Sequence, residues 1–217
     1  MVVLSELPNL ATNAPLWLSL LTVGVNAVVG ALQGYQDASR HWDLVGVGVF
    51  ALLMGLGGGF IRDMLLGTLP AQSLRTPWYL ATVLTCAAAV LVVGQWLVRL
   101  HAVLIVLNAV ALGLFAITGA AAALSQGLPG VCAVLIGAIT AVGGGVLVSV
   151  VQGRVPTILV ASTPNALLAV FGALTYVLLA PFVQGLAAVL GLASVITAQL
   201  AVDRWNITTH PAGASSF

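Results

Sequence analysis

The chain has 217 residues, of which 61% are hydrophobic and 5% are charged. Soluble domains carry about 25% charged residues, so this composition predicts an integral membrane protein. The formal net charge is +1 and no lysine is present, which excludes the basic face that a nucleic-acid partner would require.

Proline, glycine and charged residues divide the chain into seven predicted membrane-spanning helices. The fold class is therefore an all-α, polytopic membrane protein with a single transmembrane domain over residues 1–217. The sixth helix has an alternative start near Thr157 with a bend at Pro164. The predicted spans are residues 15–35, 42–66, 77–98, 102–124, 129–151, 164–180 and 181–202.

The second and fifth spans each contain three consecutive glycines followed by a matching segment. GGGFIRDMLLGTLP (residues 57–70) aligns without a gap to GGGVLVSVVQGRVP (residues 143–156), and VGA at 29–31 matches TGA at 118–120. This spacing predicts an internal repeat of three helices, over 15–98 and 102–180, with 181–202 as an unpaired seventh helix. Because three is odd, the second copy must enter the membrane from the opposite side, as in inverted-repeat transport proteins.

The two triplets, Gly57, Gly58 and Gly59 with Gly143, Gly144 and Gly145, are the first candidates for a functional site. Each glycine inside a helix costs about 0.5–1 kcal/mol relative to alanine, so a triplet is expected to interrupt or kink the helix and free carbonyl groups for cations. The alternative is close helix packing, which small residues permit in membranes. Their duplication at equivalent positions favours an interruption that lines a pathway.

Arg62 and Asp63 form the single charged pair inside a predicted span. Ionisable groups in a bilayer usually face partners or water. Adjacent helical positions diverge by about 100°, so we expect one of the two to face the pathway and the other to bind backbone or a neighbouring helix, rather than both facing one pore as an ion pair. Interfacial snorkelling of both residues is the alternative.

Other polar residues are weaker candidates for pore lining or gating. Ser149 and Gln152 follow the second triplet, and Val148 and Ser149 replace the Arg-Asp pair there. Asp63, or Asp43 at the start of the second span, could raise the local cation concentration. The sequence shows no catalytic triad, paired carboxylates, phosphate loop or metal-ligand pattern, so we expect neither an enzyme nor a metal or organic cofactor.

Arginine placement predicts the orientation in the membrane. Loop arginines favour the cytoplasmic side, and four of them fall on one side of the seven-helix arrangement whereas Arg75 falls on the other. This predicts a cytoplasmic C-terminus. The four arginines on the expected cytoplasmic side are Arg40, Arg99, Arg154 and Arg204.

The segments GLGGGFIRDMLLGTLP and AVGGGVLVSVVQGRVP, the VGA and TGA elements and the closing DRWNI resemble the trimeric intracellular cation (TRIC) channel family and its bacterial glycine-triplet-RD relatives, some of them described as glycine transporters. The resemblance covers about residues 17–205. It implies a homotrimer in a prokaryotic cell membrane, with a pore in each protomer, the second and fifth helices kinked at the triplets, and potassium as the main permeant ion. Membrane lipids are further partners, but no basic lipid-binding motif is found here. Many bacterial relatives carry RD in both copies, which this chain does not.

Three functions remain open at this stage. A passive, potassium-permeable channel is favoured. A secondary transporter of a small zwitterion such as glycine also suits an inverted repeat. A structural membrane scaffold built on small-residue packing is the third.

Overall fold

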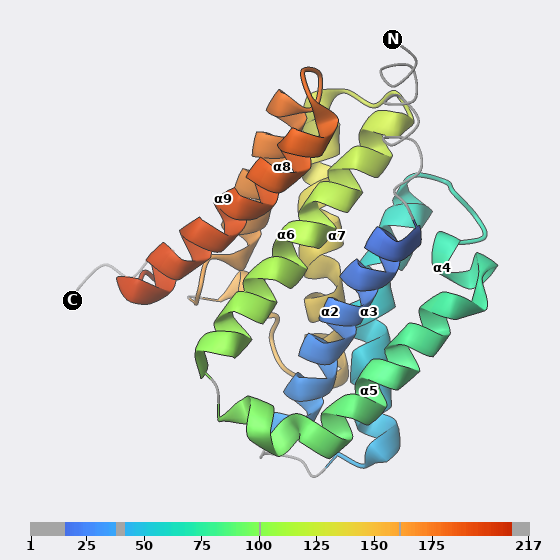
Figure 1. Cartoon of the computed structure of the whole chain (residues 1–217), viewed down its shortest axis with the longest axis vertical. Coiled ribbons are helices and arrows are strands. Elements are labelled where there is room, and N and C mark those ends of the chain that lie inside the picture. Colours follow the sequence, from blue (N-terminus) through green and yellow to red (C-terminus); the bar gives the residue numbers. More distant parts are fainter. Residues whose placement is uncertain (1–15, 38–41, 100, 161, 210–217) are drawn as a thin grey trace.

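The structure, a computed structural model, describes residues 16–37, 42–99, 101–160 and 162–209, and all its regular elements there are helical. Figure 1 shows a bundle of long helices with one short helix, α4, at its edge. In chain order the elements are α2 (Leu16–Gln36), α3 (Leu44–Leu65), α4 (Gln72–Arg75), α5 (Pro77–Val98), α6 (His101–Ser125), α7 (Gly130–Val151), the 3₁₀ turn η1 (Thr157–Leu159), α8 (Asn165–Leu179) and α9 (Gln184–Arg204).

Six of the seven predicted spans are helices long and apolar enough to cross a membrane. The sixth span is the exception, because α8 has 15 residues. A helix of that length rises about 22 Å, which is less than the ~30 Å of a bilayer core. The alternative start near Thr157 is a separate element, η1, so the chain does not continue as one helix bent at Pro164. The short helix α4 was not predicted.

The two predicted three-helix units pack in the same way. In the first unit, α2 contacts α3 and α5, and α3 contacts α5; in the second, α6 contacts α7 and α8, and α7 contacts α8. The central contact joins α3 to α7, and α9 packs against α6 and α8 (Figure 1). The third helix of each unit follows a short helical element, α4 or η1.

The ends of α3 and α7 have matching hydrogen bonds, which supports the sequence alignment. Gly67 and Gly153 both adopt left-handed backbone, with φ of 67° and 68°. After α3, the Thr68 amide donates to the carbonyl of Asp63, and after α7 the Arg154 amide donates to that of Ser149, both at 2.9 Å. A left-handed glycine that follows the last helical turn is a common way to end a helix, because glycine carries no Cβ to clash.

The expected interruption of the helices at the glycine triplets is wrong. Both α3 and α7 continue as α-helix through their triplets. The first two glycines of each triplet instead bring the two helices together: a Cβ on Gly57 would lie 2.6 Å from Cδ1 of Leu147, and one on Gly144 would lie 2.7 Å from the carbonyl oxygen of Met54. Close packing, the alternative considered from the sequence, explains these glycines.

The glycines of the VGA and TGA elements have a matching role inside each unit. A Cβ on Gly30 would overlap Met54 and the backbone of Phe50 in α3, and one on Gly119 would lie 2.5 Å from Oγ1 of Thr140 in α7. Each unit therefore has a close helix pair that depends on glycine. These contacts place α3 and α7 at the centre of the bundle.

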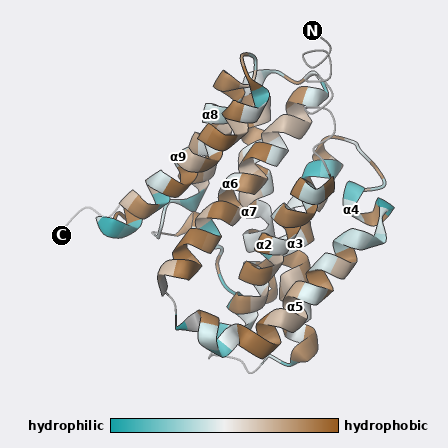
Figure 2. Ribbon diagram, viewed as in Figure 1, coloured by the Kyte–Doolittle hydropathy of each residue, from teal (hydrophilic) through white to brown (hydrophobic). Residues whose placement is uncertain are grey.

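The outside of the bundle is apolar. Figure 2 shows hydrophobic residues along the helices and hydrophilic ones gathered near helix ends. Aromatic and aliphatic side chains such as Trp96, Phe182 and Val92 are exposed, and α5 and α9 are the least buried of the six long apolar helices. Such a surface fits lipid or further copies of the chain, and the protein is a multi-pass membrane protein.

Candidate functional site

Two hollows, each lined by both polar and apolar groups, lie on opposite sides of the contact between α3 and α7. These helices run antiparallel, since Gly58 lies against Thr140 whereas Gly57 lies against Leu147. Their C-terminal ends are therefore at opposite ends of the bundle. The hollow beside the C-terminal end of α3 has a volume of about 40 Å³, and the one beside the C-terminal end of α7 about 390 Å³. We call them the narrow hollow and the wide hollow.

The third glycine of each triplet opens into a hollow. A Cβ on Gly59 would meet nothing within 4 Å, and one on Gly145 would meet only the tip of Met54, at 3.8 Å. Gly59 lines the narrow hollow and Gly145 lines the wide one. Within each triplet, two glycines thus serve packing and the third lines a polar space.

Arg62 and Asp63 both line the narrow hollow, where they form an ion pair. Nη2 of Arg62 lies 2.7 Å from Oδ1 of Asp63, and the two side chains are 13% and 5% exposed. The expectation that neighbouring positions could not face one pore as an ion pair is wrong, because the long arginine side chain reaches back to its neighbour. Asp63 also accepts a hydrogen bond from the Gln72 amide at 2.8 Å, so the expected contact with backbone is present.

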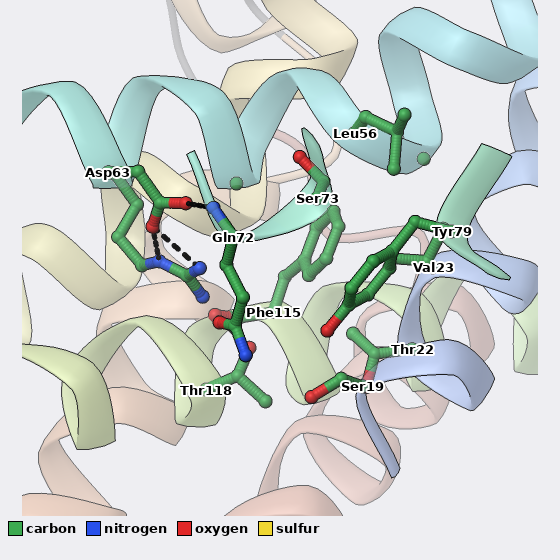
Figure 3. Close-up of a pocket in the computed structure, with 13 residues that line it drawn as sticks. Ser19, Thr22, Val23, Leu56, Asp63, Gln72, Ser73, Tyr79, Phe115 and Thr118 are labelled. Carbon is green, nitrogen blue, oxygen red and sulfur yellow. Dashed lines mark hydrogen bonds and ion pairs between the residues drawn. The ribbon is translucent and has the colours of Figure 1, made fainter. Parts of the chain in front are cut away.

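Hydroxyl groups and apolar side chains together line the rest of the narrow hollow. Figure 3 shows Tyr79, Thr22 and Ser19 at one end, Asp63 bonded to Gln72 at the other, and the Phe115 ring between them. A volume of about 40 Å³ accommodates a few water molecules, since one requires about 10–15 Å³. The narrow hollow is therefore a small, wettable space rather than a docking pocket.

The wide hollow contains a second ion pair, which joins the two three-helix units. Nη2 of Arg154 lies 2.6 Å from Oδ1 of Asp37, which follows α2. Oδ2 of Asp37 accepts hydrogen bonds from Nε1 of Trp42, at 2.9 Å, and from Nε2 of Gln152, at 3.4 Å. The carboxylate thus receives donors from the start of α3, the end of α7 and the loop after α7.

Apolar and backbone groups separate the two hollows. Phe115 borders the narrow hollow and Met54 the wide one, and they are 4% and 8% exposed. Between them, a Cβ on Gly58 would overlap the carbonyl oxygen of Thr140 and would lie 3.4 Å from Cε2 of Phe115. The crossing of α3 and α7 is therefore closely packed between the two hollows.

The remaining predicted site residues are placed as follows. Ser149 and Gln152 line the wide hollow. Asp43 caps the start of α3, where its Oδ1 accepts the Gly46 amide at 2.8 Å, and it lines neither hollow. Val148 is buried at the α3 side of α7. In the described part of the chain, no cluster of three or more histidine, cysteine, aspartate or glutamate side chains could hold a metal ion.

Sequence reasoning missed Asp37 and Arg154 as a site and assigned no role to Phe115. Arg154 was used only for orientation. Its partner is 117 residues away, so no local spacing connects them. The aligned repeats did contain a signal for the two hollows. Ser19 lines the narrow hollow, and Asn108, at the equivalent position of the second unit, lines the wide one.

Comparisons with known proteins place this geometry in a family. The family model described as glycine transporter matches residues 16–95 and 105–181, two segments that fall on the two three-helix units. A UPF0126 membrane protein of Deinococcus radiodurans is 36% identical over 143 residues, which is 66% of this chain and 65% of that protein. The match thus spans just under two thirds of that relative's length.

Solved structures of TRIC cation channels have the same fold. One, determined to explain conductance through these channels, matches with a TM-score of 0.81 and 26% identity, covering 92% of this chain and 98% of the other. The orthologue from Rhodobacter sphaeroides matches with a TM-score of 0.79 and 30% identity, covering 88% and 98%. The chain belongs to the glycine transporter family of UPF0126 membrane proteins, and its fold is that of the TRIC channels.

Proposed function

We propose that the protein is a potassium-permeable cation channel in which ions cross each protomer of a homotrimer through the wide hollow, the α3–α7 constriction and the narrow hollow. The observation that carries this proposal is the pair of polar hollows aligned on opposite sides of one glycine-lined crossing. The similarity to TRIC cation channels supports it. Channel and membrane-protein relatives also support a protein that is not an enzyme.

The described conformation corresponds to a closed pathway, because Phe115, Met54 and Thr140 fill the crossing. Opening requires α3 and α7 to shift relative to each other. A contact made of glycines against backbone has few side chains to interlock, so it can slide more easily than a contact of large residues. A kink at the triplets, as expected from the sequence, is one way to make this shift and is part of the proposal.

Permeating ions would remain largely hydrated. The hollows are lined by hydroxyl, amide and charged side chains, and no ring of backbone carbonyls of the potassium-filter type is present in the described residues. Carbonyls of α3 and α7 near the triplets are engaged in continuous helices. We therefore expect a channel that prefers cations but discriminates modestly between potassium and sodium.

We also infer an inverted repeat and its orientation in the membrane. The antiparallel α3 and α7 and their matching C-terminal hydrogen bonds support the inversion. The wide hollow would face the cytoplasm together with the C-terminus, because three of the arginines in the described residues lie at that end and two at the other. The former are Arg99, Arg154 and Arg204, and the latter are Arg62 and Arg75. Arg40 lies outside the described residues.

A glycine carrier is less well supported by the geometry. Holding a zwitterion requires one cationic and one anionic group that are available to the ligand. The charged side chains that line each hollow are paired with each other, at 2.7 Å in the narrow hollow and 2.6 Å in the wide one. Bound lipid and the trimer contacts are expected on the exposed apolar faces of the bundle, and no cofactor is required.

The test is recording from the purified protein in planar bilayers. Discrete current steps in potassium chloride without any organic substrate, with a reversal potential that favours potassium over chloride and differs little between potassium and sodium, are expected. Very strong selectivity for potassium over sodium would contradict hydrated permeation. Glycine-dependent uptake into vesicles without current steps would instead establish a carrier, and vesicles without flux of ions or glycine would indicate a scaffold.

A further inference from the structure

Asn26 is a buried side chain in the middle of α2 that bonds to the backbone of the other three-helix unit. The residue is 1% exposed. Its Nδ2 donates to the carbonyl oxygen of Thr22, one turn earlier, at 2.9 Å, and to that of Ala111 in α6, at 3.3 Å. Because carbonyl groups only accept hydrogen bonds, the nitrogen of the carboxamide must face both of them. Both of its hydrogens are therefore engaged, one of them between the two units.

The aligned repeats place an aromatic residue where the second unit would need a matching donor. With VGA aligned to TGA, Asn26 corresponds to Phe115, and Thr22 corresponds to Ala111. The phenylalanine ring has no polar group that could return the bond. In the continuous helix α6, the carbonyl of Ala111 also faces the amide of Phe115. Asn26 therefore bonds to the turn of α6 that carries Phe115.

We propose that Asn26 is a positioning residue for gating: its hydrogen bond to Ala111 stabilises the closed crossing with Phe115 in place, and loss of the bond favours the open state. This inference rests on the proposed channel function, in which α3 and α7 shift relative to each other. Asn26 lines neither hollow. It would therefore change the equilibrium between closed and open states without changing the path of the ion.

The close helix pairs inside each unit transmit such a shift to α2 and α6. Gly30 holds α2 against Met54 of α3, and Gly119 holds α6 against Thr140 of α7, in both cases without room for a Cβ. When α3 and α7 slide, α2 therefore moves with α3 and α6 moves with α7. The bond between α2 and α6 is 3.3 Å long, and a donor and acceptor about 3.6 Å apart no longer form a hydrogen bond. A small displacement between the units would break it.

The experiment compares single-channel records of the full-length wild type with those of Asn26→Leu, Asn26→Ala and Gln199→Leu in planar bilayers. Leucine has the branched shape of asparagine but no donor, and alanine removes the donor in a second way if the leucine variant does not assemble. Gln199→Leu is the matched control, since Gln199 is a buried carboxamide in α9, outside both units, and lines neither hollow. The ratio of open to closed time and the unitary conductance are read from the same records.

Both Asn26 variants are expected to raise the ratio of open to closed time roughly three-fold, which is the average effect of a hydrogen bond between membrane helices. Their unitary conductance should equal that of the wild type, and Gln199→Leu should match the wild type in both quantities. Introduced together with Phe115→Ala, Asn26→Leu should add much less than three-fold, because the two changes then act on one contact.

Three results would overturn the inference while leaving the channel function intact: an unchanged ratio in both Asn26 variants, a changed unitary conductance at an unchanged ratio, or an equal gain in Gln199→Leu. The second result would show that Asn26 lines the pathway, and the third that loss of any buried carboxamide loosens the bundle. A full gain in the presence of Phe115→Ala would show that Asn26 does not act through Phe115. Absence of current in the wild type would instead refute the channel function itself.

Discussion

Replacing the second and third glycines of the first triplet by alanine should have opposite effects on stability. At Gly58 a Cβ would overlap the carbonyl oxygen of Thr140, a backbone atom that cannot rotate away, whereas at Gly59 it would meet nothing within 4 Å. Alanine gains about 0.5–1 kcal/mol in helix propensity at either position, but overpacking costs about 1–3 kcal/mol. Gly58→Ala should therefore be destabilised by about 1–2 kcal/mol and Gly59→Ala stabilised by up to about 1 kcal/mol.

The measurement is the apparent melting temperature of the detergent-solubilised protein, followed by the loss of the assembled peak in size-exclusion chromatography after heating. A difference of about 2 kcal/mol corresponds to roughly 4–8 °C for a domain of this size. Gly48, on the same helix and with nothing within 4 Å of a Cβ, provides the control Gly48→Ala. Equal melting temperatures for the Gly58 and Gly59 variants would refute the close contact between α3 and α7.

A larger substitution at Gly59 tests whether this glycine lines the narrow hollow or packs against a neighbouring helix. Gly59→Leu would place a branched side chain in a hollow of about 40 Å³, so the conductance should fall by at least half while the melting temperature stays near that of Gly48→Leu. If the amount of folded protein and the current fell together, Gly59 would be required for helix packing instead. Unchanged current would remove the narrow hollow from the pathway.

Three further variants test single contacts. Asp63→Asn should lower stability by about 1.5–3 kcal/mol, measured as the same melting shift, because it weakens the buried bonds to Arg62 and the Gln72 amide; an unshifted protein would contradict this. Phe115→Ala should raise the conductance at a stability cost of about 3 kcal/mol, and unchanged current would place the constriction elsewhere. Gly67→Ala and Gly153→Ala should each cost about 1–2 kcal/mol, as expected of equivalent left-handed turns, and unequal losses would argue against the repeat.

The sequence was sufficient to predict six of the membrane-spanning helices, because prolines, glycines and charged residues mark their ends locally. Prolines and glycines fix where helices start and end, and the shared spacing of the glycines to Gly67 and Gly153 corresponds to matching turns in the structure. It was not sufficient to predict whether a triplet interrupts its helix. That outcome depends on what the triplet packs against, here the partner triplet in the other unit.

Neither of the two ion pairs could be predicted from the local sequence. Helical geometry places the Cα–Cβ directions of neighbouring residues far apart, but Arg62 is long enough to fold back onto Asp63. Asp37 and Arg154 lie outside the helices of their units, and the pair forms only once α2 and α7 are packed into one bundle. Neither result could be read from spacing, because side-chain length and long-range packing decide them.

The two ends of the proposed pathway differ in how their charged side chains are buried. The equivalents of Arg62 and Asp63 in the second unit are Val148 and Ser149, and neither carries a charge. Among the described residues, one acidic and one basic side chain line the wide hollow, as they do the narrow one. In the narrow hollow both partners are buried, and separating them would leave uncompensated charge in the protein. In the wide hollow the arginine is half in solvent, so dissolved salt screens its attraction to Asp37 more strongly. Ionic strength should therefore affect ion entry at the wide end and have little effect at the narrow end.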